Sequence, residues 1–112
     1  MEHKGVYVMR IASMLSGMHP QTLRKYERVG LLSPSRSGML RMYSDDDIAL
    51  LKMIKYLVEE LGLNLAGVEL ALNLRSRLLE MEQELMFLAA DSQFRRRLAK
   101  AIDEMLHLIE PM

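Results

Sequence analysis

The residues best suited to bind a ligand are basic and hydrogen-bonding side chains gathered in the first forty-odd residues. The set comprises His19, Gln21, Thr22, Arg24, Lys25, Tyr26 and Arg28, followed by Arg36, Arg41 and Tyr43. Cations, amides and hydroxyls are the groups with which proteins hold DNA phosphates and read base edges. This cluster therefore predicts binding to nucleic acid.

Proline and glycine define the helices that carry this cluster. Apolar spacing predicts a short helix over Val8–Leu15 with Gly17 as its C-cap. A second helix is expected over Pro20–Val29, because Pro20 is favoured at a first helical position and Gly30 stands at the far end. Two short helices joined by a tight glycine turn are typical of a helix-turn-helix.

Residues 31–43 predict a small β-hairpin, or wing, that would carry two of the basic residues. A turn is expected near Ser37 and Gly38, with Arg36 and Arg41 on its two arms. Two other side chains have a structural alternative to DNA contact. For Tyr43, packing in the core is as good an interpretation as contact with a phosphate. For His19, a structural role in the turn is at least as good an interpretation as contact with a base.

The hydrophobic pattern beyond the wing predicts helices throughout. Ser44 is expected to cap a helix over Asp45–Leu61, with Asp47 completing a capping box, so a metal site at the three adjacent aspartates is disfavoured. Gly62 would end that helix, and Asn64 would cap a further short one.

From residue 74 the apolar residues repeat at alternating intervals of four and three, which is the pattern of a coiled-coil seam. The seam residues are Leu74, Leu78, Met81, Leu85 and Leu88. After a turn near residues 89–91, a last amphipathic helix is expected to bury Phe94, Leu98, Ala101, Met105 and Leu108. Whether this helix packs within one subunit or between two is left open.

These elements predict a mainly α-helical chain in two parts. Residues 1–73 form a winged helix-turn-helix domain, and residues 74–112 form a coiled-coil dimerisation helix with an amphipathic tail. Charge divides in a similar way, with a net charge of +5 for residues 1–43 and −5 for residues 44–112. The basic part is suited to approach DNA and the acidic part to stand away from it.

Composition argues against several other classes of protein. The chain has no cysteine and only three scattered histidines, so we expect neither a redox or zinc site nor a bound cofactor. No apolar run approaches the roughly 20 residues that span a bilayer, so a soluble, intracellular protein without a membrane partner is expected. No phosphate-binding loop or nucleophile with its base is visible, so the chain is not expected to be an enzyme.

Several motifs together resemble the DNA-binding domain of the MerR family. They are the run GMHPQTLRKYERVGLLSPSRS, the R-x-Y-S of residues 41–44 and the helix DDDIALLKMIKYL. With LGLNLAGVELALNL, the first run is similar to the heat-shock repressor branch of that family. The resemblance covers roughly residues 7–75.

The resemblance implies a function as well as a fold. It implies a homodimer that joins through an antiparallel coiled coil and binds inverted-repeat promoter DNA. The heat-shock branch further implies repression of chaperone operons with an Hsp70-type chaperone as co-repressor, in the cytoplasm and associated with the nucleoid. The alternative is a MerR-like chaperone modulator that binds a J-domain co-chaperone, but such proteins lack the basic recognition helix found here.

Overall fold

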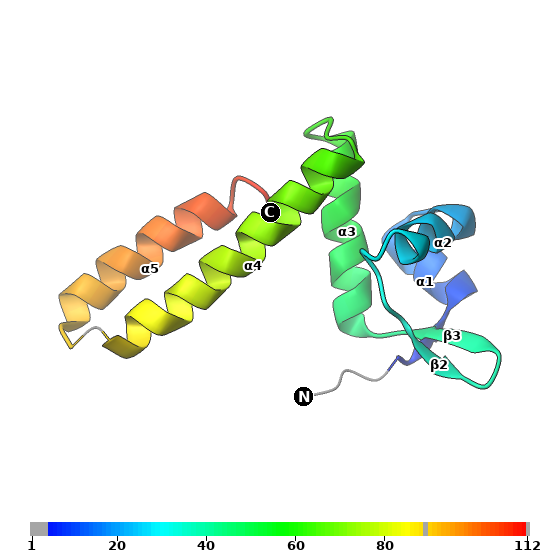
Figure 1. The fold of residues 1–112 in the computed structure, drawn as a ribbon, viewed down its shortest axis with the longest axis horizontal. Coiled ribbons are helices and arrows are strands. Elements are labelled where there is room, and N and C mark those ends of the chain that lie inside the picture. Colours follow the sequence, from blue (N-terminus) through cyan, green and yellow to red (C-terminus); the bar gives the residue numbers. More distant parts are fainter. Residues whose placement is uncertain (1–4, 89, 112) are drawn as a thin grey trace. The chain divides into compact units, whose positions relative to one another are not determined.

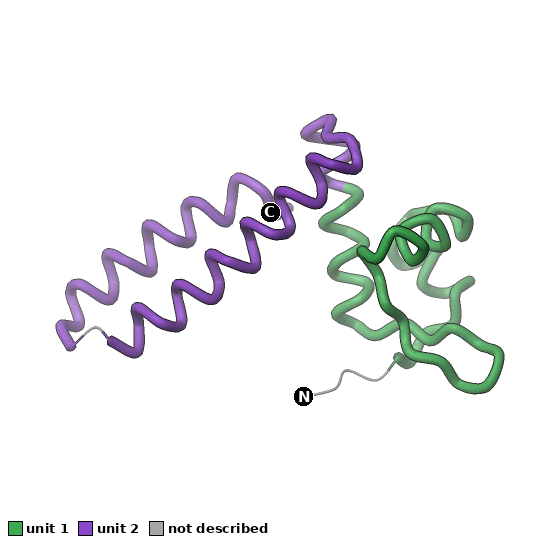
Figure 2. The backbone as a smooth tube through the Cα atoms, in the orientation of Figure 1, with its two compact units in different colours: residues 1–55 green, residues 56–112 purple. Residues whose placement is uncertain are grey.

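The computed structural model describes residues 5–88 and 90–111 and divides the chain into two compact units, residues 1–55 and 56–112 (Figure 2). In the described part the elements follow one another as β1 (Tyr7–Val8), α1 (Met9–Ser16), α2 (Pro20–Arg28), β2 (Ser35–Ser37), β3 (Leu40–Tyr43), α3 (Asp45–Glu59), α4 (Leu65–Leu88) and α5 (Ser92–Leu106) (Figure 1). The chain is mainly α-helical, as the sequence predicted, and passes from one unit to the other within α3.

Helices α1 and α2 form the predicted helix-turn-helix. Gly17 ends α1 at φ +71°, a left-handed conformation that favours glycine, and its N–H donates to the carbonyl of Ser13 at 2.9 Å. Pro20 then occupies the first turn of α2. The two helices contact each other, and Leu23 on the inner side of α2 is fully buried.

The wing is part of a three-stranded antiparallel sheet in the order β1-β3-β2. The hairpin turns at Gly38, where φ is +62°, and the register sets Arg36 opposite Arg41. Strand β1 pairs Tyr7 with Tyr43 and was not predicted, because a strand of two residues has no measurable alternation. The wing is therefore tied to the N-terminal segment as well as to its own hairpin.

Helix α3 begins with the predicted capping box. The N–H of Ser44 donates to Asp47 Oδ2 at 2.9 Å, and the N–H of Asp47 donates to Ser44 Oγ at 3.0 Å. Asp45 accepts a hydrogen bond of 2.7 Å from the Tyr7 hydroxyl, which joins β1 to the start of the helix. These carboxylates therefore have structural partners in the fold.

Tyr43 lies in the core of the first unit and not at its surface. It is fully buried, together with Leu32, Leu51 and Ile54, and its hydroxyl has no hydrogen-bond partner among the described residues. Burial raises the pKa of the Tyr43 phenol above its ordinary value, and the negative charge of Glu27 adds to the rise. Of the two alternatives left open for Tyr43, burial supports packing, because a side chain without solvent exposure does not reach a phosphate.

The second unit is built on two long helices, α4 and α5, that lie side by side in opposite directions (Figures 1 and 2). The last helix thus packs on its own chain. Asn64 caps α4 by accepting from the N–H of Gly67 at 2.9 Å, and Asp91 caps α5 by accepting from the N–H of Gln93 at 2.9 Å. Beyond α5, Glu110 is within 3.3 Å of Arg75 and ties the end of the described chain to α4.

The buried face of α5 differs by one residue from the predicted face. Ile102 and Leu106 are buried where the sequence predicted Ala101 and Met105, and Leu98 is half-buried. The predicted residues Phe94, Ala101, Met105 and Leu108 are exposed. The helix carries two neighbouring apolar stripes, and spacing alone does not identify the one that packs on α4.

Helix α4 is continuous from Leu65 to Leu88, whereas the sequence predicted a short helix followed by a separate seam. The predicted boundary between residues 73 and 74 therefore falls inside a helix. The compact units divide instead between Lys55 and Tyr56.

We expect Ser44→Ala to lower the free energy of unfolding by about 1 kcal/mol, because it removes one of the two hydrogen bonds of the capping box. Urea denaturation followed by circular dichroism measures the change. Ser76→Ala, at an exposed position inside α4, is the control and should stay within about 0.5 kcal/mol of the wild type. Equal midpoints for the Ser44→Ala variant and the wild type would contradict the role of the cap.

We expect Tyr43→Phe to leave the free energy of unfolding at pH 7 within about 1 kcal/mol of the wild type, or to raise it, because the lost hydroxyl is buried without a partner. At high pH the free energies of unfolding of the wild type and the Tyr43→Phe variant should differ. Unfolded tyrosine ionises near pH 10 while folded Tyr43 keeps its proton, so the stability of the wild type falls as the pH rises through about 10. Denaturation between about pH 9 and 11 measures this fall, and an equally steep fall in the variant contradicts the assignment.

Candidate nucleic-acid interface

The outer face of α2 gathers most of the residues that the sequence singled out. Gln21, Thr22, Arg24, Lys25 and Arg28 line one open hollow of about 500 Å³. They share this face because helical spacing of three and four residues brings them to one side. Thr22 is half-buried and the other four are exposed.

The inner face of α2 holds the helix in place. Leu23 is fully buried and Tyr26 is only 7% exposed, so both pack in the core of the first unit. Packing, and not presentation of a donor on the surface, is thus the main role of Tyr26. It is not among the residues that line the hollow.

His19 acts as the N-cap of α2, the structural role that the sequence left open. Its Nδ1 accepts a hydrogen bond of 3.1 Å from the N–H of Gln21. An accepting Nδ1 places the proton of the neutral ring on Nε2. The ring is exposed beside the start of the helix, so a base contact through its other edge stays a prediction.

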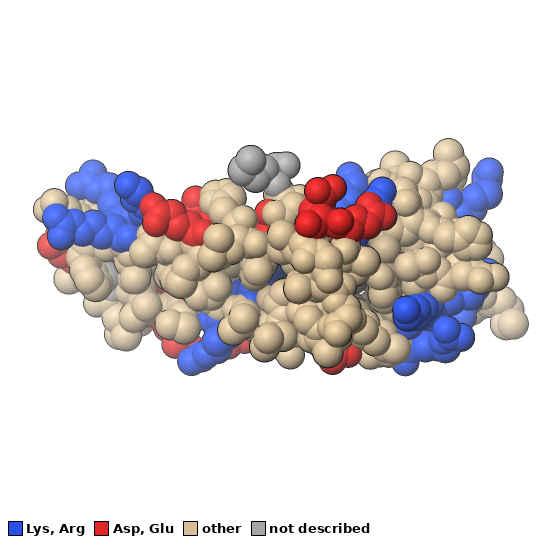
Figure 3. All heavy atoms as spheres, turned by 90° about the horizontal axis from the view of Figure 1, so that it is seen from above, with Lys and Arg blue, Asp and Glu red and all other residues tan. Residues whose placement is uncertain are grey.

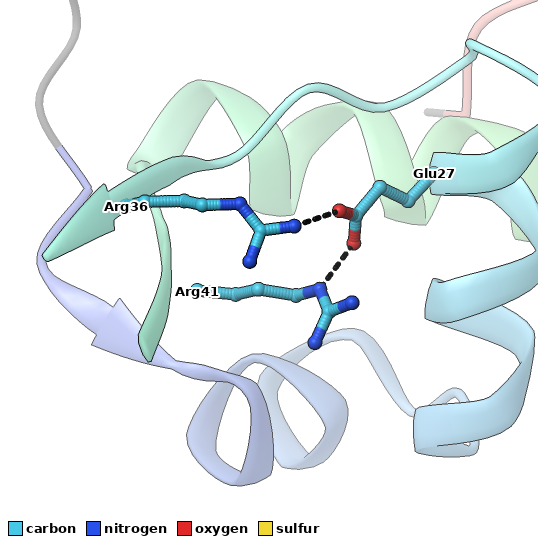
Figure 4. Close-up of polar contacts among 3 residues, drawn as sticks. All are labelled: Glu27, Arg36 and Arg41. Carbon is cyan, nitrogen blue, oxygen red and sulfur yellow. Dashed lines mark hydrogen bonds and ion pairs between the residues drawn. The ribbon is translucent and has the colours of Figure 1, made fainter. Parts of the chain in front are cut away.

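The two arginines of the wing are both paired with one carboxylate on α2 (Figure 4). Arg36 Nη2 lies 3.1 Å from Glu27 Oε1, and Arg41 Nε lies 2.7 Å from Glu27 Oε2. The side chain of Glu27 is 19% exposed, that of Arg41 is 33% exposed and that of Arg36 is 54% exposed. Glu27 therefore joins α2 to both strands of the hairpin.

Sequence reasoning missed Glu27, although a signal was present. It is the single acidic residue between His3 and Ser44, in a segment that is otherwise basic. A lone carboxylate among cations is expected to pair with some of them, but the sequence does not say with which. The hairpin register decides the partners, because it sets Arg36 and Arg41 opposite each other on one face of the hairpin.

Three cations of α2 remain outside such pairs. Within residues 5–88 and 90–111, no carboxylate oxygen lies within 4.0 Å of a side-chain nitrogen of Arg24, Lys25 or Arg28. Lysine and arginine atoms gather on the surface of this first unit, toward the right of Figure 3. As far as the described residues go, the surface thus offers positive charge outside ion pairs, beside amide and hydroxyl donors, which suits a phosphate backbone and base edges.

Two other kinds of site were sought in the part of the chain that the structure describes. No group of three or more His, Cys, Asp or Glu side chains there is placed to hold a metal ion. No helix there is long and apolar enough to cross a membrane.

Comparison with known proteins agrees with a helix-turn-helix in the first part of the chain. A family model described as "MerR HTH family regulatory protein" matches residues 7–74. No solved structure gives a significant match to the chain.

Two curated relatives extend the similarity beyond that region. A Streptomyces coelicolor protein, provisionally named heat shock protein HspR, is 44% identical over 90 residues, which cover 80% of this chain and 60% of that protein. The HTH-type transcriptional regulator YfmP of Bacillus subtilis is 34% identical over 94 residues, which cover 82% of this chain and 66% of that protein. The matches thus span less than two thirds of either relative. The family model covers more than half of this chain, and the chain therefore belongs to the MerR family of helix-turn-helix regulatory proteins.

Proposed function

We propose that this chain binds double-stranded promoter DNA and regulates transcription. The observation that carries the proposal is the outer face of α2, where Gln21, Thr22, Arg24, Lys25 and Arg28 line one hollow. A recognition helix needs such donors to reach base edges in the major groove and such cations to hold the flanking phosphates. Membership of a family of regulatory proteins supports the same function, and no enzymatic activity is proposed.

The residues of α2 divide by position. Gln21 and Thr22 lie in the first turn, which in a helix-turn-helix is the part that meets the bases. Arg24, Lys25 and Arg28 follow along the same face and supply phosphate contacts, with Arg24 close enough to the first turn to read a base as well. The wing adds Arg36 at the edge of this surface, whereas Tyr26 and Tyr43 support it from within.

The proposal includes a homodimer. On the seam of α4, Leu74 is 52% exposed, Met81 is 37% exposed and Leu88 is 75% exposed, while Leu78 and Leu85 are half-buried. Soluble monomers rarely expose a long apolar row of this kind. A second copy that covers the seam would present two recognition helices to the half-sites of an inverted repeat.

The regulated genes are proposed to be those of the heat-shock response. The support is the relative named as a heat shock protein, which is 44% identical over 80% of this chain. In this proposal the chain is a repressor that acts in the cytoplasm at the nucleoid, with an Hsp70-type chaperone as co-repressor. The three cations of α2 disfavour the alternative of a chaperone modulator that binds a J-domain co-chaperone, because that function does not require a basic helix.

We expect Arg24→Ala to weaken binding to an operator fragment by tenfold or more, since it removes one charged contact worth about 1–3 kcal/mol. Fluorescence anisotropy with DNA from the chain's own promoter region, at several salt concentrations, measures the loss. Lys100→Ala changes an exposed cation of α5 and should bind like the wild type. Absence of a specific wild-type complex at low salt would refute DNA-binding regulation.

We expect Leu74→Glu to convert a dimer into a monomer, because it places a charge on the proposed seam. Analytical ultracentrifugation over a range of micromolar concentrations measures the change, and circular dichroism checks that the helices remain. Met14→Glu alters a more exposed apolar residue, on α1, and should leave the dimer intact. A wild type that sediments as a monomer throughout contradicts the proposed seam.

A further inference from the structure

We propose that Glu27 is a positioning residue that gives the two wing arginines different roles on DNA. In this inference, which rests on the proposed DNA binding, Arg41 stays on Glu27 in the complex and holds the wing against α2. Arg36 leaves Glu27 and pairs with a phosphate. Glu27 thereby decides how many charges the wing contributes to binding.

The arrangement begins with a charge problem inside the hairpin. Arg36 and Arg41 face each other across β2 and β3, and like charges directly opposite each other destabilise a sheet. Glu27 offers one carboxylate oxygen to each guanidinium group (Figure 4). The three side chains together carry a single positive charge in place of two.

The two ion pairs are not equivalent. The Arg41 pair is the shorter one, at 2.7 Å, and joins side chains that are 33% and 19% exposed. The Arg36 pair is 3.1 Å long, and its arginine side chain is 54% exposed. Ion pairs between exposed side chains contribute little to stability, whereas a mostly buried carboxylate needs at least one partner. Loss of Arg36 leaves Glu27 with the better partner.

Arg36 can therefore exchange its ion pair with Glu27 for one with a DNA phosphate with little loss of stability. Guanidinium binds phosphate through two parallel hydrogen bonds, and each phosphate neutralised releases counterions from the duplex. The exchange breaks one exposed pair and keeps the mostly buried one. Glu27 also prevents Arg41 from adding a contact of its own.

The test measures how the association constant for a non-specific duplex depends on salt. Each phosphate contact adds about 0.9 to the magnitude of the slope of log K against log[salt]. Arg36→Gln should make the slope shallower by about 0.9, and Glu27→Gln should make it steeper by about 0.9 because Arg41 is released. The double variant should return to the wild-type slope, since Arg41 then replaces Arg36. Between about 50 and 200 mM salt, each single change alters the ratio of association constants about 3.5-fold.

Thermal unfolding of the same proteins separates the two arginines. Arg41→Gln should lower the melting temperature more than Arg36→Gln does, because it removes the shorter and more buried pair. Arg77→Gln is the matched control, since Arg77 pairs with Glu80 at 3.1 Å on α4 and should leave the slope unchanged.

Two results would overturn the inference. One is an unchanged slope in Arg36→Gln, which means that Arg36 remains on Glu27 in the complex. The other is a Glu27→Gln variant that melts at a lower temperature but keeps the wild-type slope, which means that the carboxylate serves stability alone. Failure of the wild type to bind any duplex would instead refute the proposed function. If the wild type binds with the expected salt dependence but the slopes of the variants differ from those given above, only this inference is refuted.

Discussion

The pairing of Glu27 with Arg36 and Arg41 is the interaction on which the candidate interface depends. All three residues of β2 are exposed, so the outer strand of the wing has little apolar burial to fix it. Its hydrogen bonds to β3 set its register, and Arg36 joins it to α2 through Glu27, while Arg41 of β3 pairs with the same carboxylate. A carboxylate on a basic helix thus makes the helix and the hairpin one surface.

This carboxylate also has to lie in the right place on the helix. Glu27 follows Tyr26, which packs in the core, and precedes Arg28, which lines the hollow, so it stands at the border between the two faces of α2. From this border its side chain reaches the hairpin without occupying the outer face. Its carboxylate therefore pairs with the wing arginines, and among the described residues it forms no ion pair with the cations of the outer face.

Local signals in the sequence predicted most of the first unit. Proline, glycine and a serine-aspartate capping box act within a few residues of themselves, so the bounds of α1 and α2, the turn of the wing and the start of α3 follow from them. The outer face of α2 was predicted for the same reason. What the sequence missed or left open depended on distant contacts. Strand β1 exists only because β3 pairs with it, Tyr43 is buried by the unit around it, and Glu27 finds its partners through the hairpin register.

The second unit shows why spacing predicted helices but not their contacts. Helix α5 packs on α4 through the stripe that contains Ile102 and Leu106, and a neighbouring stripe with Phe94, Met105 and Leu108 stays exposed. Both stripes fit helical spacing, so the sequence could not rank them. Apolar side chains also remain exposed along α4, although α5 covers part of that helix. The α4–α5 pair carries apolar side chains on its outer surface as well as between the helices, so two helices alone cannot bury them all. We propose that a second copy of the chain covers the exposed apolar side chains.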